Sequence, residues 1–173
     1  MTKTIIASFA LALLFLTSAT SYADDVNWQT VKSDACGGFT VKMPGTPKEE
    51  SAAEKEVILR TYSVNEWPEG IFTVACIVYL PSAKVNVQDE LTTNRDNFNK
   101  ESEATLISEA TITLQGVPGL DFTSQSAKHR TNYRVRVYAD GNRVYLASAG
   151  VRKGHDELIK IEQFLGSFHL TDR

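Results

Sequence analysis

Polar and hydrophobic residues alternate over several short segments of this chain, which is the pattern of half-buried β-strands. In one such segment, Phe39, Val41 and Met43 alternate with polar or charged side chains. The run over 71–80 is apolar at nearly every position, so it predicts a central strand that is covered on both faces. In chain order, the predicted strands span 27–33, 39–44, 57–64, 71–80, 104–116, 119–126, 133–139 and 142–150.

Two further segments have the apolar spacing of amphipathic helices. The first follows Asn86, which can cap a helix N-terminus, and its apolar side consists of Val87, Leu91 and Phe98. The second follows Gly154 and has an apolar stripe of Leu158, Ile161, Leu165 and Phe168. The predicted order is strands, one helix, more strands and a closing helix. With hairpin-type connections, this order predicts an α+β fold with a mostly antiparallel sheet.

Two glycine-containing segments predict turns and not ligand-binding loops. Asp140-Gly141 lies between two β-rich runs and predicts a two-residue hairpin loop, in which Val137 pairs with Val144. Gly116–Gly119 lacks the lysine and the helix start of a phosphate-binding loop, and its proline has no N–H group. We expect Val117-Pro118-Gly119 to form a tight turn that only bends the chain.

The first 23 residues are typical of a secretory signal. Lys3 precedes an uncharged apolar segment of 12 residues, and Ser21 and Ala23 suit signal-peptidase cleavage. The apolar segment is shorter than the ~20 residues that a transmembrane helix needs. We therefore expect an exported protein, periplasmic or extracellular, whose remaining part, 24–173, is a single domain without a membrane span.

Charge is unevenly distributed along the chain, whose formal net charge is −3. Residues 24–123 contain 8 Lys/Arg against 16 Asp/Glu, whereas residues 124–153 contain 7 against 1. Nucleic-acid-binding domains are normally basic overall. An acidic chain with one basic segment does not suggest a nucleic-acid partner.

The basic segment contains the candidate binding residues. Arg130, Arg134 and Arg136 have the same parity on one predicted strand, and Arg143 lies across the hairpin turn. Guanidinium groups on one sheet face can bind an anionic group of a partner protein or a lipid headgroup. Two alternatives remain open: the arginines form a solvated surface beside tyrosines, or carboxylates from the acidic remainder of the chain pair with them.

The chain contains two cysteines, Cys36 and Cys76. In an oxidising compartment an even pair can form a disulfide, which would close a loop of 40 residues and stabilise the fold by roughly 4 kcal/mol. The alternative is two buried free thiols, because Cys76 lies within an apolar run and buried cysteine behaves as a small hydrophobic residue. The sequence leaves both possibilities open.

The sequence contains no recognised catalytic or metal-binding motif. His129, His155 and His169 lack the spacing of metal ligands, and no Gly-x-Ser-x-Gly nucleophile motif occurs. We therefore expect no metal, no cofactor and no catalytic residue. The alternative is a small exported, hydrolase-like enzyme whose site combines residues that are distant in sequence.

Three stretches resemble a known family of bacterial exported proteins. GGFTVKMPGTP (37–47), LQGVPGLDF (114–122) and FLGSFHL (164–170) occur in the order found in PsbP/Mog1-like domains, which include DcrB-like proteins. The resemblance covers essentially all of 28–170 and rests on turn and core positions. It implies an α/β/α sandwich with an antiparallel sheet, and a non-catalytic binding or accessory role through protein–protein interaction in the cell envelope.

Overall fold

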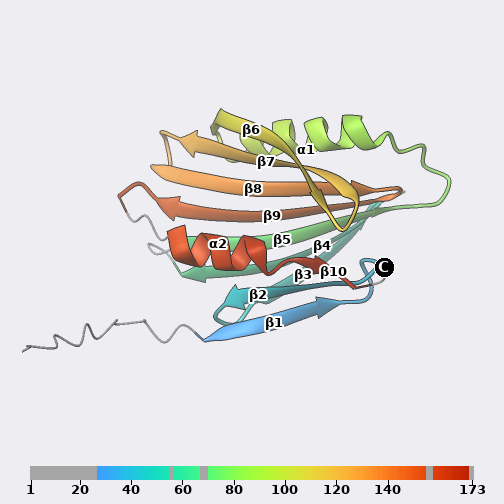
Figure 1. The fold of residues 1–173 in the computed structure, drawn as a ribbon, viewed down its shortest axis with the longest axis horizontal. Coiled ribbons are helices and arrows are strands. Elements are labelled where there is room, and N and C mark those ends of the chain that lie inside the picture. The colour runs from blue at the N-terminus through green and yellow to red at the C-terminus, as the bar shows by residue number, and fades with distance from the viewer. Residues whose placement is uncertain (1–26, 55–56, 67–69, 155–157, 172–173) are drawn as a thin grey trace, which may run out of the picture.

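The computed structural model describes residues 27–54, 57–66, 70–154 and 158–171, and within them the chain forms three layers (Figure 1). The predicted signal segment lies outside the described residues. In chain order, the elements are β1 (Trp28–Ser33), β2 (Phe39–Pro44), β3 (Lys48–Glu54), β4 (Val57–Glu66), β5 (Gly70–Tyr79), α1 (Val87–Glu101), β6 (Thr105–Leu114), β7 (Val117–Ser126), β8 (Thr131–Asp140), β9 (Arg143–Arg152), α2 (Leu158–Gly166) and β10 (His169–Leu170).

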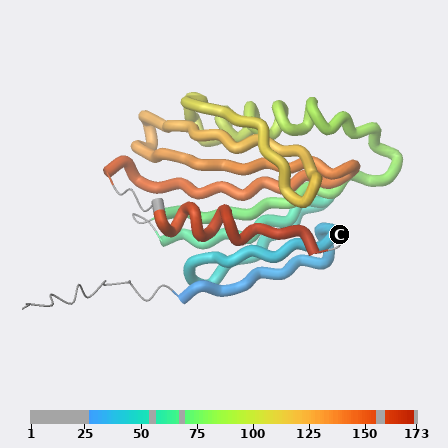
Figure 2. The backbone as a smooth tube through the Cα atoms, in the orientation of Figure 1, coloured from blue at the N-terminus to red at the C-terminus, as the bar shows by residue number. Residues whose placement is uncertain are grey.

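A seven-stranded antiparallel sheet forms the central layer, in the order β3-β4-β5-β9-β8-β7-β6. β5 lies beside β9 although α1 and three strands separate them in sequence, as Figure 2 shows. A second antiparallel sheet contains β1, β2 and β10. The predicted α+β class with a mostly antiparallel sheet is confirmed.

Side chains of the central sheet alternate between two covered faces. On one face, Val135 and Val137 belong to a buried cluster with Leu91 of α1. On the other face, the core includes Tyr145 of β9 and Phe164 of α2, together with residues of the small sheet. The two helices therefore cover opposite faces of the sheet, which is the α/β/α arrangement.

The predicted helix signals agree with the structure. Asn86 caps α1, and its side chain accepts hydrogen bonds from the backbone N–H groups of Gln88 and Asp89. The apolar side of α1 faces the sheet, since Leu91 is buried. In α2, the predicted stripe is buried at Ile161 and Leu165. Phe168 is also buried, but it lies beyond the end of the helix at Gly166, so the predicted stripe was too long by this residue.

The predicted β8–β9 loop was wrong by one position. Gly141 and Asn142 form the loop, so that Val137 pairs with Leu146 and not with Val144. The Asn142 side chain donates a hydrogen bond to the Tyr79 carbonyl (2.7 Å), and the Asn142 carbonyl accepts one from the Tyr79 N–H (2.8 Å). These contacts with the end of β5 favour Asn142 inside the loop. The partner of each residue moves by two positions, and because this number is even the face of each side chain is unchanged.

The turn expected at Val117–Gly119 was also wrong. The chain turns at Gln115 and Gly116, which both have positive φ (50° and 83°), and β7 already begins at Val117. Gly119 lies opposite Tyr138 within the sheet, and a Cβ atom at position 119 would lie 2.5 Å from the tyrosine ring. This glycine therefore permits close packing of the Tyr138 ring.

The polar segment before the strand at 57–64 forms an additional strand, β3, which was not predicted. It pairs with β4 at one edge of the central sheet. Its described side chains are exposed. Without a buried face, an edge strand lacks the alternation of polar and apolar residues from which strands are predicted.

A disulfide between Cys36 and Cys76 joins the β1–β2 loop to β5, with Cα atoms 6.2 Å apart. Both residues are buried. The Tyr145 hydroxyl donates a hydrogen bond to the Cys36 carbonyl (2.9 Å), which also fixes this loop to β9. The disulfide predicted as one of two alternatives is confirmed.

Candidate functional site

A groove of about 370 Å³ lies on the face of the central sheet that carries α2. The helix packs against β9 and β2, and β6, β7 and β8 lie to one side of it in Figure 1. Ile107 of β6 forms an exposed apolar rim of the groove, and the buried Ile161 of α2 also lines it. Its floor contains four polar residues from the middle strands: Thr123, Gln125, Asn132 and Arg134.

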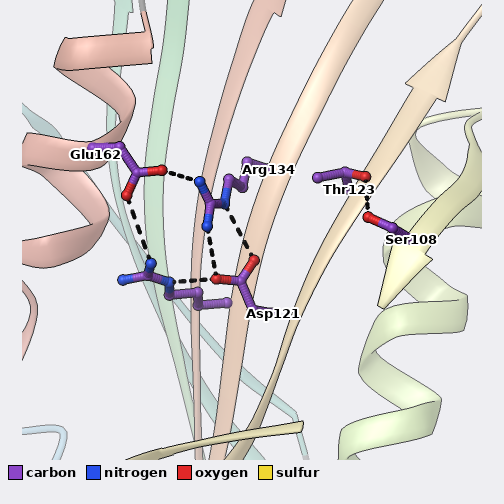
Figure 3. Close-up of polar contacts among 6 residues, drawn as sticks. Ser108, Asp121, Thr123, Arg134 and Glu162 are labelled. Carbon is purple, nitrogen blue, oxygen red and sulfur yellow. Dashed lines mark hydrogen bonds and ion pairs between the residues drawn. The ribbon is translucent and has the colours of Figure 1, made fainter. Parts of the chain in front are cut away.

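Strand register places the floor residues on one face, because Thr123 lies opposite Arg134 and Gln125 lies opposite Asn132. The Gln125 amide donates a hydrogen bond to Asn132 Oδ1 (2.9 Å). The hydroxyl oxygens of Thr123 and Ser108 are 2.7 Å apart, so the polar contacts extend to β6 (Figure 3). The groove therefore combines a hydrogen-bonded polar floor with an apolar rim.

A β-bulge exposes the Ile107 side chain at the rim. The pairing between β6 and β7 shifts between Leu106 and Ser108, which leaves Ile107 outside the regular register. The side chain of a bulged residue points in a different direction from those of a regular strand. Ile107 is 63% exposed, so an apolar group is presented to solvent beside polar ones.

Arg134 belongs to an ion-pair cluster, here called the Arg134 cluster, which consists of Asp121, Arg134, Arg136 and Glu162. Asp121 accepts hydrogen bonds from Arg134 through both oxygens (3.2 Å each) and from Arg136 Nε (2.9 Å). Glu162 of α2 pairs with Arg134, and its Oε2 lies 3.8 Å from Arg136 Nη2 (Figure 3). Two carboxylates thus balance two guanidinium groups and join the sheet to the helix.

The members of the cluster differ in their contact with water. The side chain of Asp121 is 15% exposed, whereas that of Glu162 is 50% exposed. Burial on its own would raise the pKa of Asp121, but the hydrogen bonds and charges of Arg134 and Arg136 hold this pKa below its ordinary value. Asp121 is therefore the fixed anion of the cluster, and Glu162 is its more accessible one.

The structure brings together two of the four predicted arginines. Arg134 and Arg136 are paired with carboxylates, which is one of the alternatives that the sequence left open. Arg130 lies in the turn before β8 and Arg143 pairs with the last residue of β8, so about 30 Å separates them at the usual strand rise. Arg143 donates a hydrogen bond to the Gly37 carbonyl (3.4 Å). Binding by these arginines stays a prediction.

Sequence reasoning did not identify Asp121, Glu162 or Ile107 as site residues. Asp121 is the sole charged residue of β7, and its parity with Thr123 puts it on the groove face. That parity was the available signal. The partner of Asp121 on β8 depends on the register of two strands, and the place of Glu162 depends on how α2 packs.

Other candidate chemistry lies away from the groove. His129 Nε2 is 3.8 Å from Glu103 at an exposed turn, His169 is exposed, and His155 lies outside the described residues. The described residues contain no group of three or more His, Cys, Asp or Glu that could hold a metal ion. None of the helices in the described part is long and apolar enough to cross a membrane.

Comparison with known sequences gave no match, either to a protein-family model or to a curated protein. Two solved structures have TM-scores below 0.5, which are too low to establish a common fold. One is a protein from Bacteroides thetaiotaomicron, with 14% identity, a TM-score of 0.39 and coverage of 77% of this chain and 45% of that one. The other is a protein of unknown function from Pseudomonas aeruginosa, with 9% identity, a TM-score of 0.41 and coverage of 74% and 85%.

A third solved structure is similar over nearly the whole chain. It is the cyanobacterial PsbP protein, CyanoP, from Synechocystis sp. PCC 6803, with a TM-score of 0.59 and 14% sequence identity. The match covers 90% of this chain and 99% of that protein. At this identity the likeness concerns the fold alone, and the chain therefore has a PsbP-like α+β fold.

Proposed function

We propose that the protein is a non-catalytic binding protein of the cell envelope and that it binds a partner protein in the groove beside α2. One observation carries this proposal: the exposed Ile107 side chain stands at the rim of a groove whose floor is polar and ends at Arg134. Binding sites combine apolar walls with a few placed polar groups, and arginine is enriched at protein interfaces.

The Arg134 cluster supplies a recognition element for an acidic group of the partner. Asp121 holds Arg134 from the sheet side, and Glu162 contacts it from the more exposed side. A carboxylate of a partner can replace Glu162 without a change in net charge at the cluster. Such an exchange gives the predicted arginine site a mechanism, in which Arg134 and Arg136 bind the incoming anion.

The disulfide supports an envelope location. Disulfides form and persist in oxidising compartments, which include the periplasm and the extracellular space. Cys36 and Cys76 are bonded in this structure, and the chain begins with residues typical of a secretory signal. The PsbP-like fold is also compatible with the accessory role that the sequence resemblance implies.

The described residues favour binding over the enzymatic alternative. A cysteine nucleophile would need a free thiol beside a base, whereas both cysteines are joined to each other. The contact between His129 and Glu103 lies at a turn, with both side chains about half exposed. The groove lining among the described residues includes neither histidine nor cysteine.

Site-specific photo-cross-linking tests the groove as a binding site. A photoreactive phenylalanine analogue replaces Ile107 in one variant and Ile58, an exposed isoleucine of β4, in a matched control. Both variants are irradiated with envelope extract of the source organism, and the products are identified by mass spectrometry. We expect a discrete adduct from position 107 only, and Ile107→Asp should reduce capture of the same protein whereas Ile58→Asp should not.

Equal labelling from both positions, or none from position 107, would contradict the proposed function. A broad screen for hydrolase activity completes the experiment. Activity that disappears in a groove variant such as Thr123→Ala would favour the enzymatic alternative.

A further inference from the structure

β6 is one of the two edge strands of the central sheet. Its inner edge pairs with β7, and no strand in the described part of the chain pairs with its outer edge. The outward N–H and C=O groups of an edge strand form an unused hydrogen-bond ladder. Most β6 side chains are exposed, so the strand is accessible to another extended chain.

The opposite edge strand, β3, contains more charged residues than β6 does. β3 contains Lys48, Glu49 and Glu50, and Lys48 forms a 2.5 Å salt bridge with Glu50. Charged side chains, lysine in particular, discourage edge-to-edge pairing. β6 contains a single charged residue, Glu109, which forms a 2.7 Å ion pair with Arg95 of α1.

The regular part of β6 is long enough for strand addition. The bulge at Ile107 interrupts the register, but pairing with β7 is continuous from Ser108 to Leu114. Seven residues match the usual length of a strand in a globular protein. The segment contains Thr111, Ile112 and Thr113, which are β-branched residues that favour extended structure.

The edge also adjoins the groove. Ser108 and Ile112 lie on the groove face, because their partners in β7 are Thr123 and Gly119, which face the same side. Alternate side chains of an added strand would therefore project on the groove side, next to Ile112 and the exposed Ile107. Aliphatic side chains at these alternate positions would cover the apolar rim.

We propose that β6 binds an extended, mostly uncharged segment of a partner protein as an additional strand of the central sheet. Main-chain hydrogen bonds supply the affinity, and alternate aliphatic side chains contact Ile107 and Ile112. This inference rests on the proposed function, since it assigns the class of partner segment that lies beside the groove.

A selection experiment with synthetic peptides tests strand addition. A phage-displayed library of random linear dodecapeptides is selected on the oxidised protein, and a selected peptide is remade with N-methyl groups on alternate residues. An N-methyl group removes one donor and blocks that position of the ladder. We expect methylation of one alternate set to weaken binding at least about tenfold and methylation of the other set to have little effect.

Matched substitutions locate the added strand at β6. Thr111→Lys places a lysine on the exposed β6 edge, and Ala52→Lys places one on the exposed β3 edge. We expect the first variant to weaken binding of the selected peptide at least about tenfold and the second to leave it unchanged. Three outcomes would overturn the proposal. They are failure to select any peptide, equal effects of the two methylated sets, and peptide binding that Thr111→Lys does not alter.

The two proposals fail in distinguishable ways. If cross-linking at position 107 captures a partner but no peptide adds to β6, the binding function stands and strand addition is wrong. If a peptide binds to β6 with the expected alternation but position 107 captures no partner, the edge is a peptide site and the groove proposal is wrong.

Discussion

Arg134 and Arg136 take their positions from Asp121, whose carboxylate bonds to both guanidinium groups. These hydrogen bonds are charge-assisted and lie largely away from water, so they are stronger than exposed pairs. Loss of one partner from such a cluster leaves the remaining charges without compensation. Asp121 therefore determines whether the two arginines can lie side by side under α2.

Asp121→Asn tests this role, because the substitution keeps the shape of the side chain and removes its charge. We expect the free energy of unfolding at neutral pH to fall by about 2–4 kcal/mol, as measured by urea denaturation. The control is Asp96→Asn, at an exposed aspartate that pairs with Arg95, and it should change stability by less than about 1 kcal/mol. Equal effects of the two substitutions would contradict the assignment.

The pH dependence of the same variant gives an independent check. The pKa of Asp121 is lower in the folded protein than its ordinary value, so the carboxylate stabilises the fold above about pH 4. This contribution is lost as the pH falls through the folded-state pKa. The stability difference between wild type and Asp121→Asn should therefore shrink as the pH falls below the ordinary aspartate pKa of about 4. A difference that does not depend on pH would contradict the pKa direction.

At the scale of elements, the turn between β6 and β7 holds the C-terminal strand. The Gln115 side chain accepts a hydrogen bond from the Leu170 N–H (2.8 Å) and donates one to the Leu170 carbonyl (2.9 Å). One amide group thus reproduces the two contacts of a neighbouring strand. Because β10 pairs with β2, the turn connects the central sheet with the small sheet.

Gln115→Ala removes both contacts with Leu170. We expect the free energy of unfolding to fall by about 1–2 kcal/mol and the Leu170 amide to exchange hydrogen faster, as followed by NMR. Gln29→Ala is the control, since Gln29 donates to the Thr46 hydroxyl at an exposed position, and its effect should stay within about 0.5 kcal/mol. Unchanged exchange at Leu170 in Gln115→Ala would show that the turn does not hold β10.

At the scale of the whole molecule, the disulfide links the small sheet to the central one. It joins residues 40 positions apart, between the β1–β2 loop and β5. Both sheets contribute to the core on the α2 side, where Phe39 of β2 packs against Tyr145 of β9 and Phe168. In the unfolded chain, the covalent bond limits how far these two segments can separate, which lowers the conformational entropy of the unfolded state.

The double variant Cys36→Ala/Cys76→Ala should lose about 4 kcal/mol of unfolding free energy relative to the oxidised protein, because a loop of this length is no longer closed. Denaturation with and without a reductant should give the same loss for wild type and no change for the variant. Thiol labelling of the denatured, unreduced wild type should find no reactive thiol. Two labelled cysteines would show that the bond does not form.

Local pattern in the sequence was sufficient to predict most elements and the fold class. These elements are marked by residues that lie close together in sequence. Examples are the cap Asn86, the apolar side of α1 and the alternation in β2. Such signals do not require knowledge of the partner segment. They failed at β3, where an exposed edge strand has no buried face to mark it.

Only the tertiary structure decided the candidate site. Asp121 meets Arg134 and Arg136 through the register of β7 with β8, and Glu162 reaches them through the packing of α2. Register depends on which residues form each turn, and the hairpin loop was displaced by one residue from its predicted place. The sequence also left open whether the two cysteines form a disulfide or remain free thiols, because this too depends on tertiary structure. Bond formation requires their Cα atoms to approach to about 6 Å, and this separation depends on how the β1–β2 loop lies against β5.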